Sequence, residues 1–287
     1  MSNQNDVPVS LRSLHVYPVK SCAGVSPGEA LLSETGFDLD RAWMVTGPDF
    51  EFVTQRELPR MALIQPTLKG EEMILRAPGM LALHIALDRV ELPCRARIWK
   101  DVVNAFDMGA LCAQWLSDFL GRALRLVRLD PDARRIADPQ WTGPIEARIA
   151  LPDGFPLLVV SSASLDELNR RLAVAQAPAA TLPRFRPNLV LDGLDAHGED
   201  HLDELALDGT DGVVRLKLVK PCARCPIPDV DPATGERGHA VGEALAAYRA
   251  DARLGGAISF GMNAVIVEGI GRRLAAGQPG RASYRFD

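Results

Sequence analysis

Residues 61–86 are MALIQPTLKGEEMILRAPGMLALHIA, and this stretch is the clearest indicator of the fold class. It holds three short apolar runs, at 61–68, 73–77 and 81–86, which are separated by turns that contain Gly or Pro. Short apolar runs bounded by turn residues are typical of successive β-strands. Similar runs follow one another elsewhere in residues 1–100, at 11–19, 42–45 and 95–99. This spacing favours a barrel or a sandwich over alternating strand and helix units.

The rest of the chain predicts more strands and few helices. We expect a helix at 111–120, with Asp107 at its start and Gly121 at its end. A second helix is expected to run to about residue 175, started by a capping box of Ser164 and Glu167. The other expected elements are a short helix at 243–249 and strands at 156–160, 188–191, 213–219, 264–268 and 282–286. The predicted class is α+β and β-rich, with a domain boundary inside the Pro-, Asp- and Arg-rich segment 130–153.

The composition of the 287 residues is that of a globular protein. The chain is 47% hydrophobic, and no apolar run approaches the roughly 18 residues that a membrane span needs. The first ten residues lack the basic and apolar regions of a signal peptide, so we expect a cytoplasmic location and no membrane partner. A formal net charge of −5 argues against a nucleic-acid partner, so an anionic ligand would need a local cluster of Lys and Arg. Five cysteines are an odd number, which favours reduced thiols over a disulfide framework.

Two cysteines three residues apart, Cys222 and Cys225, lie in the segment KPCARCPIPDVDPATG at 220–235. A structural zinc site needs a second pair of ligands at the right spacing, and the sequence offers none. A redox pair of the thioredoxin type would open a helix, whereas the prolines directly after the pair favour extended chain. Two buried thiols are the structural alternative. Lys220 and Arg224 would instead favour a thiolate, and with it a metal ligand or a nucleophile.

Two further segments place a cation beside polar side chains. HVYPVKSCAGV, at 15–25, ends a strand with Lys20 and Ser21, a pair that suits a phosphate group although the glycine spacing of a P-loop is absent. A solvated loop lysine is the alternative for Lys20. FDLDRAWMVT, at 37–46, has Arg41 between an acidic and an aromatic residue, and a surface ion pair is the alternative there.

A third cationic segment, RFRPNLVLDG at 184–193, brings Arg186 and Asn188 to the start of a strand. Arginine suits bidentate contact with a phosphate, and an asparagine amide can donate and accept at the edge of a heterocycle. A simple turn is the alternative. Asp229 and Asp231 are expected to cap the turn that precedes Gly235.

Taken in order, these segments resemble the MOSC superfamily. The matching motifs are YPVKSC, DLDRAW, VTQRELPRMALI, SSASLDELN, RFRPN, CARC with VDPATG, and SFGMN, which span about residues 9–287. The order is most similar to two-part proteins that include the mitochondrial amidoxime reducing component and its bacterial relatives. The resemblance implies an N-terminal MOSC β-barrel domain at 9–130 and a β-barrel MOSC domain with a few helices at 131–287. It also implies molybdenum cofactor (Mo-molybdopterin), whose dithiolene binds the metal and whose side chain ends in phosphate.

The resemblance also implies a set of site residues. Cys225 would be the metal ligand and catalytic residue, with Cys222 as its neighbour. Contacts to the phosphate and the pterin would come from Lys20, Ser21, Arg41, Ser161, Ser162, Arg186, Asn188, Arg224, Gly261 and Asn263. Arg56 belongs to a matching motif, and whether it binds or braces stays open. Because the set comes from both halves of the chain, we expect the cofactor to lie between two domains.

The function that the resemblance implies is reduction of small N-hydroxylated or N-oxide-type molecules by molybdenum cofactor. Electrons would come from a separate protein of the ferredoxin or flavoprotein reductase type, because no cysteine follows Cys225 to hold an iron–sulfur cluster. One alternative is a carrier of molybdenum cofactor, or a sulfur-transfer protein, that reduces no substrate. A structural protein that has lost the cofactor is a further alternative, which the intact Lys, Ser, Arg and Cys positions disfavour.

Overall fold

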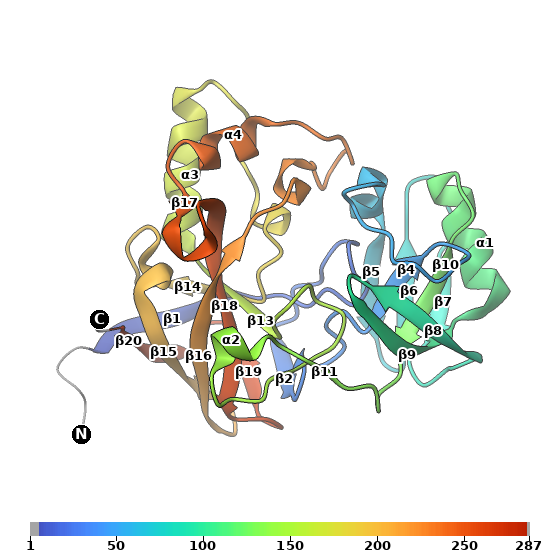
Figure 1. Ribbon diagram of the computed structural model, residues 1–287, viewed down its shortest axis with the longest axis horizontal. Helices are drawn as coiled ribbons and strands as arrows, with labels where there is room; N and C mark the ends of the chain where they lie inside the picture. Colours follow the sequence, from blue (N-terminus) through green and yellow to red (C-terminus); the bar gives the residue numbers. More distant parts are fainter. Residues whose placement is uncertain (1–5, 286–287) are drawn as a thin grey trace.

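The computed structural model describes residues 6–285 and is rich in β-strand. Strands account for 41% of the structure and helices for 19%, which confirms the predicted class. Figure 1 shows two groups of strands at opposite ends of the molecule. Among the described residues, no helix is both long and apolar enough to cross a membrane.

The larger group of strands is a closed barrel of seven. Its order is β13 (Leu157–Ser161), β14 (Leu189–Asp192), β1 (Asp6–Leu14), β20 (Pro279–Tyr284), β15 (Leu202–Gly209), β16 (Gly212–Ala223) and β18 (Ala257–Glu268). β18 pairs with β13 and so closes the barrel, and β17 (Ala250–Asp251) extends β18 at its edge. Within this barrel β13 and β14 are parallel, whereas the other neighbouring strands are antiparallel.

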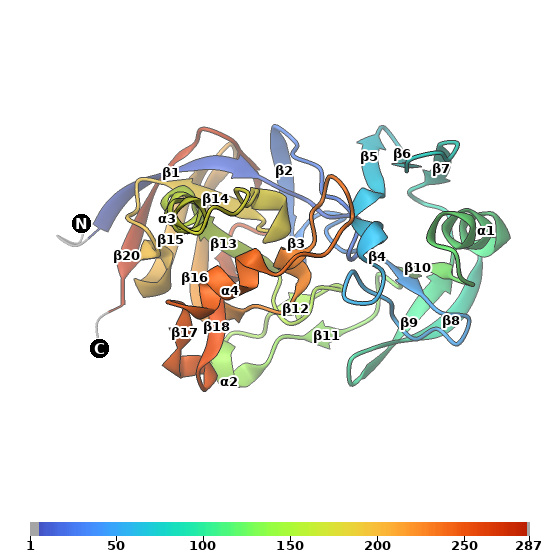
Figure 2. The ribbon, with the colours of Figure 1, turned by 90° about the horizontal axis from the view of Figure 1, so that it is seen from above.

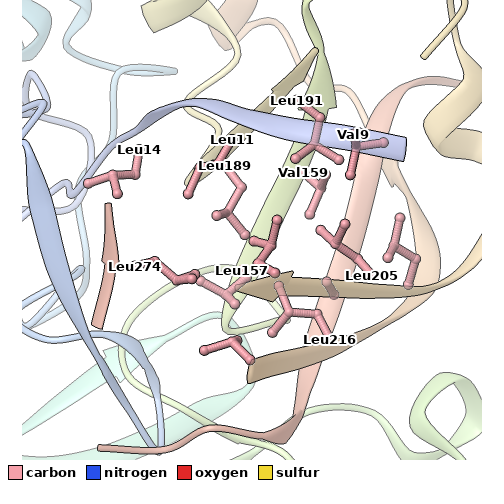
Figure 3. Close-up of a cluster of buried hydrophobic side chains, with 14 of the residues drawn as sticks. Val9, Leu11, Leu14, Leu157, Val159, Leu189, Leu191, Leu205, Leu216 and Leu274 are labelled. Carbon is pink, nitrogen blue, oxygen red and sulfur yellow. The ribbon is translucent and has the colours of Figure 1, made fainter. Parts of the chain in front are cut away.

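Aliphatic side chains from alternate strand positions fill the barrel (Figure 3). Val9 and Leu11 of β1, Val159 of β13 and Leu216 of β16 all belong to this buried cluster. Burying a side chain of this size stabilises the fold by about 1.5–3 kcal/mol. Figure 1 shows α3 (Ser162–Val174) and α4 (Ala240–Ala246) together on one side of the barrel, where they bury a second apolar cluster.

The smaller group of strands comes from the first half of the chain. One sheet has the order β4 (Trp43–Thr46), β10 (Arg125–Leu129), β9 (Asp101–Asp107) and β8 (Leu92–Ile98). The other is a meander of β5 (Gln65–Lys69), β6 (Glu72–Arg76) and β7 (Leu83–Ala86). α1 (Gly109–Leu120) shares an apolar core with both sheets, in which Trp115 and Leu116 are buried with Trp43 and Met73.

Strands from the two halves of the chain are hydrogen-bonded to each other. β1 lies between β14 and β20, and Figure 2 shows it among the strands of the larger group, although β1 is the first strand of the chain. β2 (Glu29–Ser33) pairs with β3 (Gly36–Phe37) and with β19 (Arg273–Ala275). The connection between the halves holds the pair β11 (Arg135–Ile136) and β12 (Arg148–Ile149) and the short helix α2 (Pro139–Thr142). The division of the sequence near residue 130 stays a proposal, because β1 and β2 from the first half pair with strands of the second half.

Several element boundaries differ from those predicted. β1 ends at Leu14, not at residue 19, and the chain beyond it makes only the single bridges Val16–Val25 and Val19–Trp43. Residues 61–63 form a 3₁₀ helix (Pro59–Leu63), because a proline suits the first position of a helical turn. The helix predicted at 243–249 lies three residues earlier, as α4. The last predicted strand is β20, and Phe286 lies outside the described residues.

Both predicted C-terminal ends are confirmed, Gly121 for α1 and about residue 175 for α3, whereas the predicted start of α3 is wrong. The Asp107 carboxylate accepts the backbone N–H of Gly109 at 2.9 Å, and Gly121 ends α1 with a left-handed φ of 76°. α3 begins at Ser162, before the predicted capping box. The Ser164 hydroxyl donates to the Glu199 carboxylate at 2.8 Å, so it does not cap the helix.

Candidate functional site

A cavity of about 150 Å³, partly open to solvent, lies where the barrel meets the first half of the chain. Eight of the eleven implied site residues line it: Lys20, Ser21, Arg41, Arg186, Asn188, Arg224, Cys225 and Asn263. Ser21, Arg41 and Arg186 have left-handed backbones, with φ of 65°, 48° and 56°. Such conformations cost of order 1–3 kcal/mol each in a non-glycine residue and persist where the surrounding structure enforces them.

Lys20 enters the cavity from the turn after β1. Its side chain is only 7% exposed, and the ammonium donates to the Leu151 carbonyl at 2.9 Å and to the Asp153 carboxylate. Burial lowers the Lys20 pKa, and the charge of Asp153 partly offsets this. Burial alone would raise the pKa of Asp153, but Lys20 and Arg56 outweigh it and hold this pKa well below its usual range. Lys20 is therefore a buried cation with one carboxylate partner.

Arg41 is fixed by partners from distant parts of the chain. Its guanidinium donates to the Asp40 carboxylate, to Asn188 Oδ1 at 3.1 Å and to the Arg186 carbonyl at 3.1 Å. The Asn188 amide also accepts the Leu158 N–H at 3.2 Å, so it ties Arg41 to β13. The fully buried Asn188 thus orients Arg41 through hydrogen bonds that hold it in the cavity wall.

Arg186 lies beside Arg41, and both guanidinium groups stack on Tyr17, at 4.3 and 4.4 Å from the ring centroid. Burial and the charge of Arg41 lower the Arg186 pKa to about 10. The NH1 group of Arg186 donates to the Cys22 carbonyl, whereas its buried NH2 group has no hydrogen-bond partner within the described residues. The structure therefore aligns two cations and leaves one donor group uncommitted.

The two paired cysteines differ in their surroundings. Cys225 is partly exposed in the loop after β16 and lines the cavity. Cys222 also reaches the cavity, but it packs against the apolar cluster under α3 and α4, and burial raises its pKa. The described residues contain no group of three His, Cys, Asp or Glu side chains that could hold a metal ion. A metal at Cys225 would therefore need ligands from outside the chain.

Arg224, between the cysteines, is anchored to backbone. Its guanidinium donates to the Phe260 carbonyl at 2.6 and 3.0 Å and to the Phe185 carbonyl at 3.0 Å. The two phenylalanine rings stack at 4.2 Å between centroids. Because carbonyls and not carboxylates hold Arg224, its full positive charge is left to act on the cavity.

Arg56 connects the two sides of the cavity. It donates to Asp153 Oδ2 at 3.1 Å and stacks on Trp99 at 4.8 Å. Burial disfavours its charged form, but Asp153 and Cys225 outweigh burial and raise the Arg56 pKa. Arg237 donates to the Arg56 carbonyl, which ties this segment to the loop after Cys225. Arg56 is thus a brace between Asp153 and the neighbourhood of Cys225.

The cavity has an excess of positive charge. Its lining holds six cations, namely Lys20, Arg41, Arg56, Arg184, Arg186 and Arg224. Three carboxylates pair with members of this set: Asp40, Asp153 and Asp231. Three positive charges therefore remain in a chain whose net charge is −5, which suits an anionic ligand.

Two family models match the chain, the MOSC N-terminal beta barrel domain over residues 9–123 and the MOSC domain over residues 146–279. Mitochondrial amidoxime-reducing component 1 of Homo sapiens is 36% identical, over 79% of this chain and 67% of its own length. The chain belongs to the MOSC family. Its two-part arrangement is the one that the sequence motifs predict.

Other relatives of this MOSC protein carry two kinds of name. Mitochondrial amidoxime reducing component 2 of Bos taurus is 33% identical, over 79% of this chain and 68% of its own length. Molybdenum cofactor sulfurase of Bos taurus is 28% identical, over 83% of this chain but 29% of its own length. The chain thus spans about two thirds of the length of the amidoxime reducing components and less than a third of the length of the sulfurase.

Three implied site residues do not line the cavity of the MOSC chain. Ser161 is fully buried at the start of α3, and its hydroxyl has no partner within the described residues. The Ser162 hydroxyl donates to Asp192. Gly261 is needed for packing, because a Cβ there would lie 2.7 Å from the Val159 carbonyl. Lys220 is also absent from the lining, since its ammonium lies 4.8 Å from the Trp141 ring.

Sequence reasoning missed Asp153, which lies in the turn Pro152–Gly154 and resembles any acidic turn residue. It also missed the contribution of Arg184, which pairs with Asp231 at 2.7 Å. The predicted cap is confirmed for Asp231, whose carboxylate accepts the Ala233 N–H at 2.8 Å. It is wrong for Asp229, which accepts the Gly242 N–H of α4.

Proposed function

We propose that this chain binds molybdenum cofactor in the cavity and reduces N-hydroxylated or N-oxide-type small molecules with electrons from a separate redox protein. The observation that carries the proposal is the joint presence of a partly exposed thiol and three surplus positive charges in one cavity. The names of the relatives support the same chemistry.

The residues present fit such a cofactor on three counts. Cys225 offers one soft thiolate ligand, and a dithiolene would supply the other sulfurs that the metal needs. The uncommitted NH2 group of Arg186 offers a donor to a pterin edge or a phosphate oxygen. The surplus positive charge balances an anionic phosphate, and each hydrogen bond to a charged group contributes about 1.5–3 kcal/mol.

Each wall of the cavity has its own task in this proposal. Lys20, Ser21 and Arg41 would hold the phosphate, while Asn188 keeps Arg41 in place. Arg186 and Asn263 would face the pterin, and the carbonyl-anchored Arg224 would keep a positive charge near Cys225. The backbone strain at Ser21, Arg41 and Arg186 is then the cost of orienting these side chains before the ligand arrives.

When bound, the cofactor would supply the two-electron chemistry that removes an oxygen atom from an N–O group. In the balanced reaction an N–OH group and two electrons with two protons give N–H and water. The chain would fix the cofactor, and the open side of the cavity would admit the substrate. The electron pair would come from a separate protein of the ferredoxin or flavoprotein reductase type.

A carrier or sulfur-transfer protein is the second candidate, and the match to molybdenum cofactor sulfurase favours it. In that role Cys225 would hold the cofactor, or sulfur as a persulfide, without reducing a substrate. The two candidates share the cavity and differ only in turnover.

The experiment is to purify the chain from a host that makes the cofactor, measure molybdenum and pterin, and assay an amidoxime with a chemical electron donor. About one molybdenum per chain with turnover is the expected result. Molybdenum without turnover of any N-oxygenated compound would favour the carrier. A folded chain without molybdenum or pterin would overturn the reductase and the cofactor carrier, and a persulfide on Cys225 would then be the test of the sulfur-transfer role.

A further inference from the structure

Among the described residues that line the cavity, Asp153 is the one with a carboxylate. Its Oδ1 atom accepts from the Lys20 ammonium and from Trp99 Nε1 at 3.1 Å, and its Oδ2 atom accepts from Arg56 at 3.1 Å. Two cations and one neutral donor therefore converge on this group. Converging charged donors of this kind are what a phosphate group requires.

The two ends of the Lys20–Asp153 pair differ in exposure. The Asp153 side chain is 51% exposed, whereas that of Lys20 is 7% exposed. Asp153 can therefore turn toward water. The buried Lys20 ammonium, by contrast, would be destabilised if it were left without a partner. Because its pKa is held well below the usual range, Asp153 keeps its charge at neutral pH. At neutral pH the Asp153 carboxylate is therefore separated from Lys20 by a competing anion and not by protonation.

We propose that Asp153 is a resident anion of the cavity, which an incoming phosphate group must displace from Lys20 and Arg56. This proposal rests on the proposed function, because the pterin side chain is what brings the phosphate. Asp153 keeps both cations in place while the cavity holds no phosphate, and it lowers the affinity for any phosphate that arrives. A ligand that makes only this contact is rejected, whereas a cofactor that also binds Cys225 and Arg186 is retained.

The test measures binding of inorganic phosphate by calorimetry, at fixed ionic strength, to the full chain purified from a host that cannot make the cofactor. Asp153→Asn keeps an oxygen acceptor for Lys20 and Trp99 but removes the charge. We expect about tenfold or greater tightening of phosphate binding, because a like charge a few ångströms from the phosphate is removed. The control is Glu29→Gln. It neutralises a carboxylate of β2 that pairs with Arg273 of β19 at 3.2 Å.

A double variant, Lys20→Met with Asp153→Asn, locates the effect. The gain is expected to disappear in it, while thermal melting shows that each variant is folded. Phosphate binding that Asp153→Asn leaves unchanged or weakens would overturn the proposal. So would a gain that survives Lys20→Met, or phosphate binding too weak to measure in both the parent and Asp153→Asn.

The proposed function fails separately. Molybdenum and pterin content of the parent chain tests the cofactor and does not depend on Asp153. Tighter phosphate binding by Asp153→Asn in a chain that never acquires molybdenum would keep the resident anion and remove the cofactor. Full molybdenum content of the parent chain, with phosphate binding that Asp153→Asn leaves unchanged, would keep the cofactor and remove the resident anion.

Discussion

The cavity and a buried polar cluster beside α3 share two features and differ in charge and exposure. We call the second region the Glu199 cluster, and its members are Ser161, Ser164, His197, Glu199 and Asp200. Both regions hold a non-glycine residue with a left-handed backbone, Arg186 in the cavity and His197 in the cluster. Both also hold buried polar atoms with no partner in the described part of the chain.

The difference is that the cavity is partly open and rich in cations, whereas the Glu199 cluster holds two buried carboxylates, of which Asp200 pairs with Arg249. Glu199, Ser161 and Ser164 are all fully buried. Strain and unpartnered polar atoms therefore do not identify a ligand site by themselves. They do so in the cavity because access and a charge opposite to that of the ligand accompany them.

The largest expected effect is at the two cysteines, because Cys225 is partly exposed in the cavity whereas Cys222 packs against an apolar cluster. Cys225→Ala should abolish molybdenum content and amidoxime reduction, because it removes the one thiolate proposed as metal ligand. Cys222→Ala should only weaken both, since it mainly alters packing against the cluster under α3 and α4. Metal analysis and turnover of the two purified variants give the comparison.

Each cysteine variant serves as the matched control for the other, because the two residues lie three positions apart in one segment. Equal activity of Cys225→Ala and the parent chain would remove the ligand assignment. A larger loss in Cys222→Ala than in Cys225→Ala would exchange their roles.

The motifs predicted most of the cavity because each cavity residue carries its own chemistry. A lysine beside a serine favours an anion, and a cysteine beside an arginine favours a thiolate, whatever the fold. Asp153 could not be predicted, since the contact that brings it into the cavity is with Lys20, a partner 133 positions away in the sequence. Ser161 and Ser162, which were expected to contact the pterin, lie outside the cavity lining, because the strand end that carries them is also the start of α3.

The fold shows the same limit. Local patterns predicted the meander at 65–86 and α1, whose contacts are close in sequence. They did not predict that β1 lies between β14 and β20 in the barrel, since the partner of a strand is set by packing of the whole chain. The strands β9, β10 and β15 were missed for a similar reason, as charged and polar residues interrupt their apolar alternation.

The Glu199 cluster predicts a stability that declines as pH rises, whereas the lowered pKa of Asp153 in the cavity predicts a loss of stability only at acidic pH. Burial, with the charge of Asp200, raises the Glu199 pKa to about 7, from an ordinary value of 4.5. The folded state therefore binds this proton more tightly than the unfolded state does. The resulting stability is fully present below about pH 4.5 and is lost as pH rises through about 7, a change on the order of 3 kcal/mol.

Urea denaturation between pH 5 and 8 measures this change. Glu199→Gln should flatten the decline, because the amide cannot ionise. Asp166→Asn, on the exposed face of α3, is the control and should leave the pH profile unchanged. A decline that persists in Glu199→Gln would show that another group is responsible.

The smallest expected effect separates two serines that were both implied as cofactor contacts. Ser21→Ala should reduce pterin retention about tenfold or more, since one hydrogen bond to a charged group contributes about 1.5–3 kcal/mol. Ser162→Ala should leave retention unchanged and cost about 1 kcal/mol of unfolding free energy, because its hydroxyl donates to Asp192 and faces away from the cavity lining. Pterin fluorescence after release and urea denaturation of both variants measure the two quantities. Loss of pterin from a folded Ser162→Ala chain would mean that the ligand extends beyond the cavity toward α3, and the contrast between the two regions would then fail.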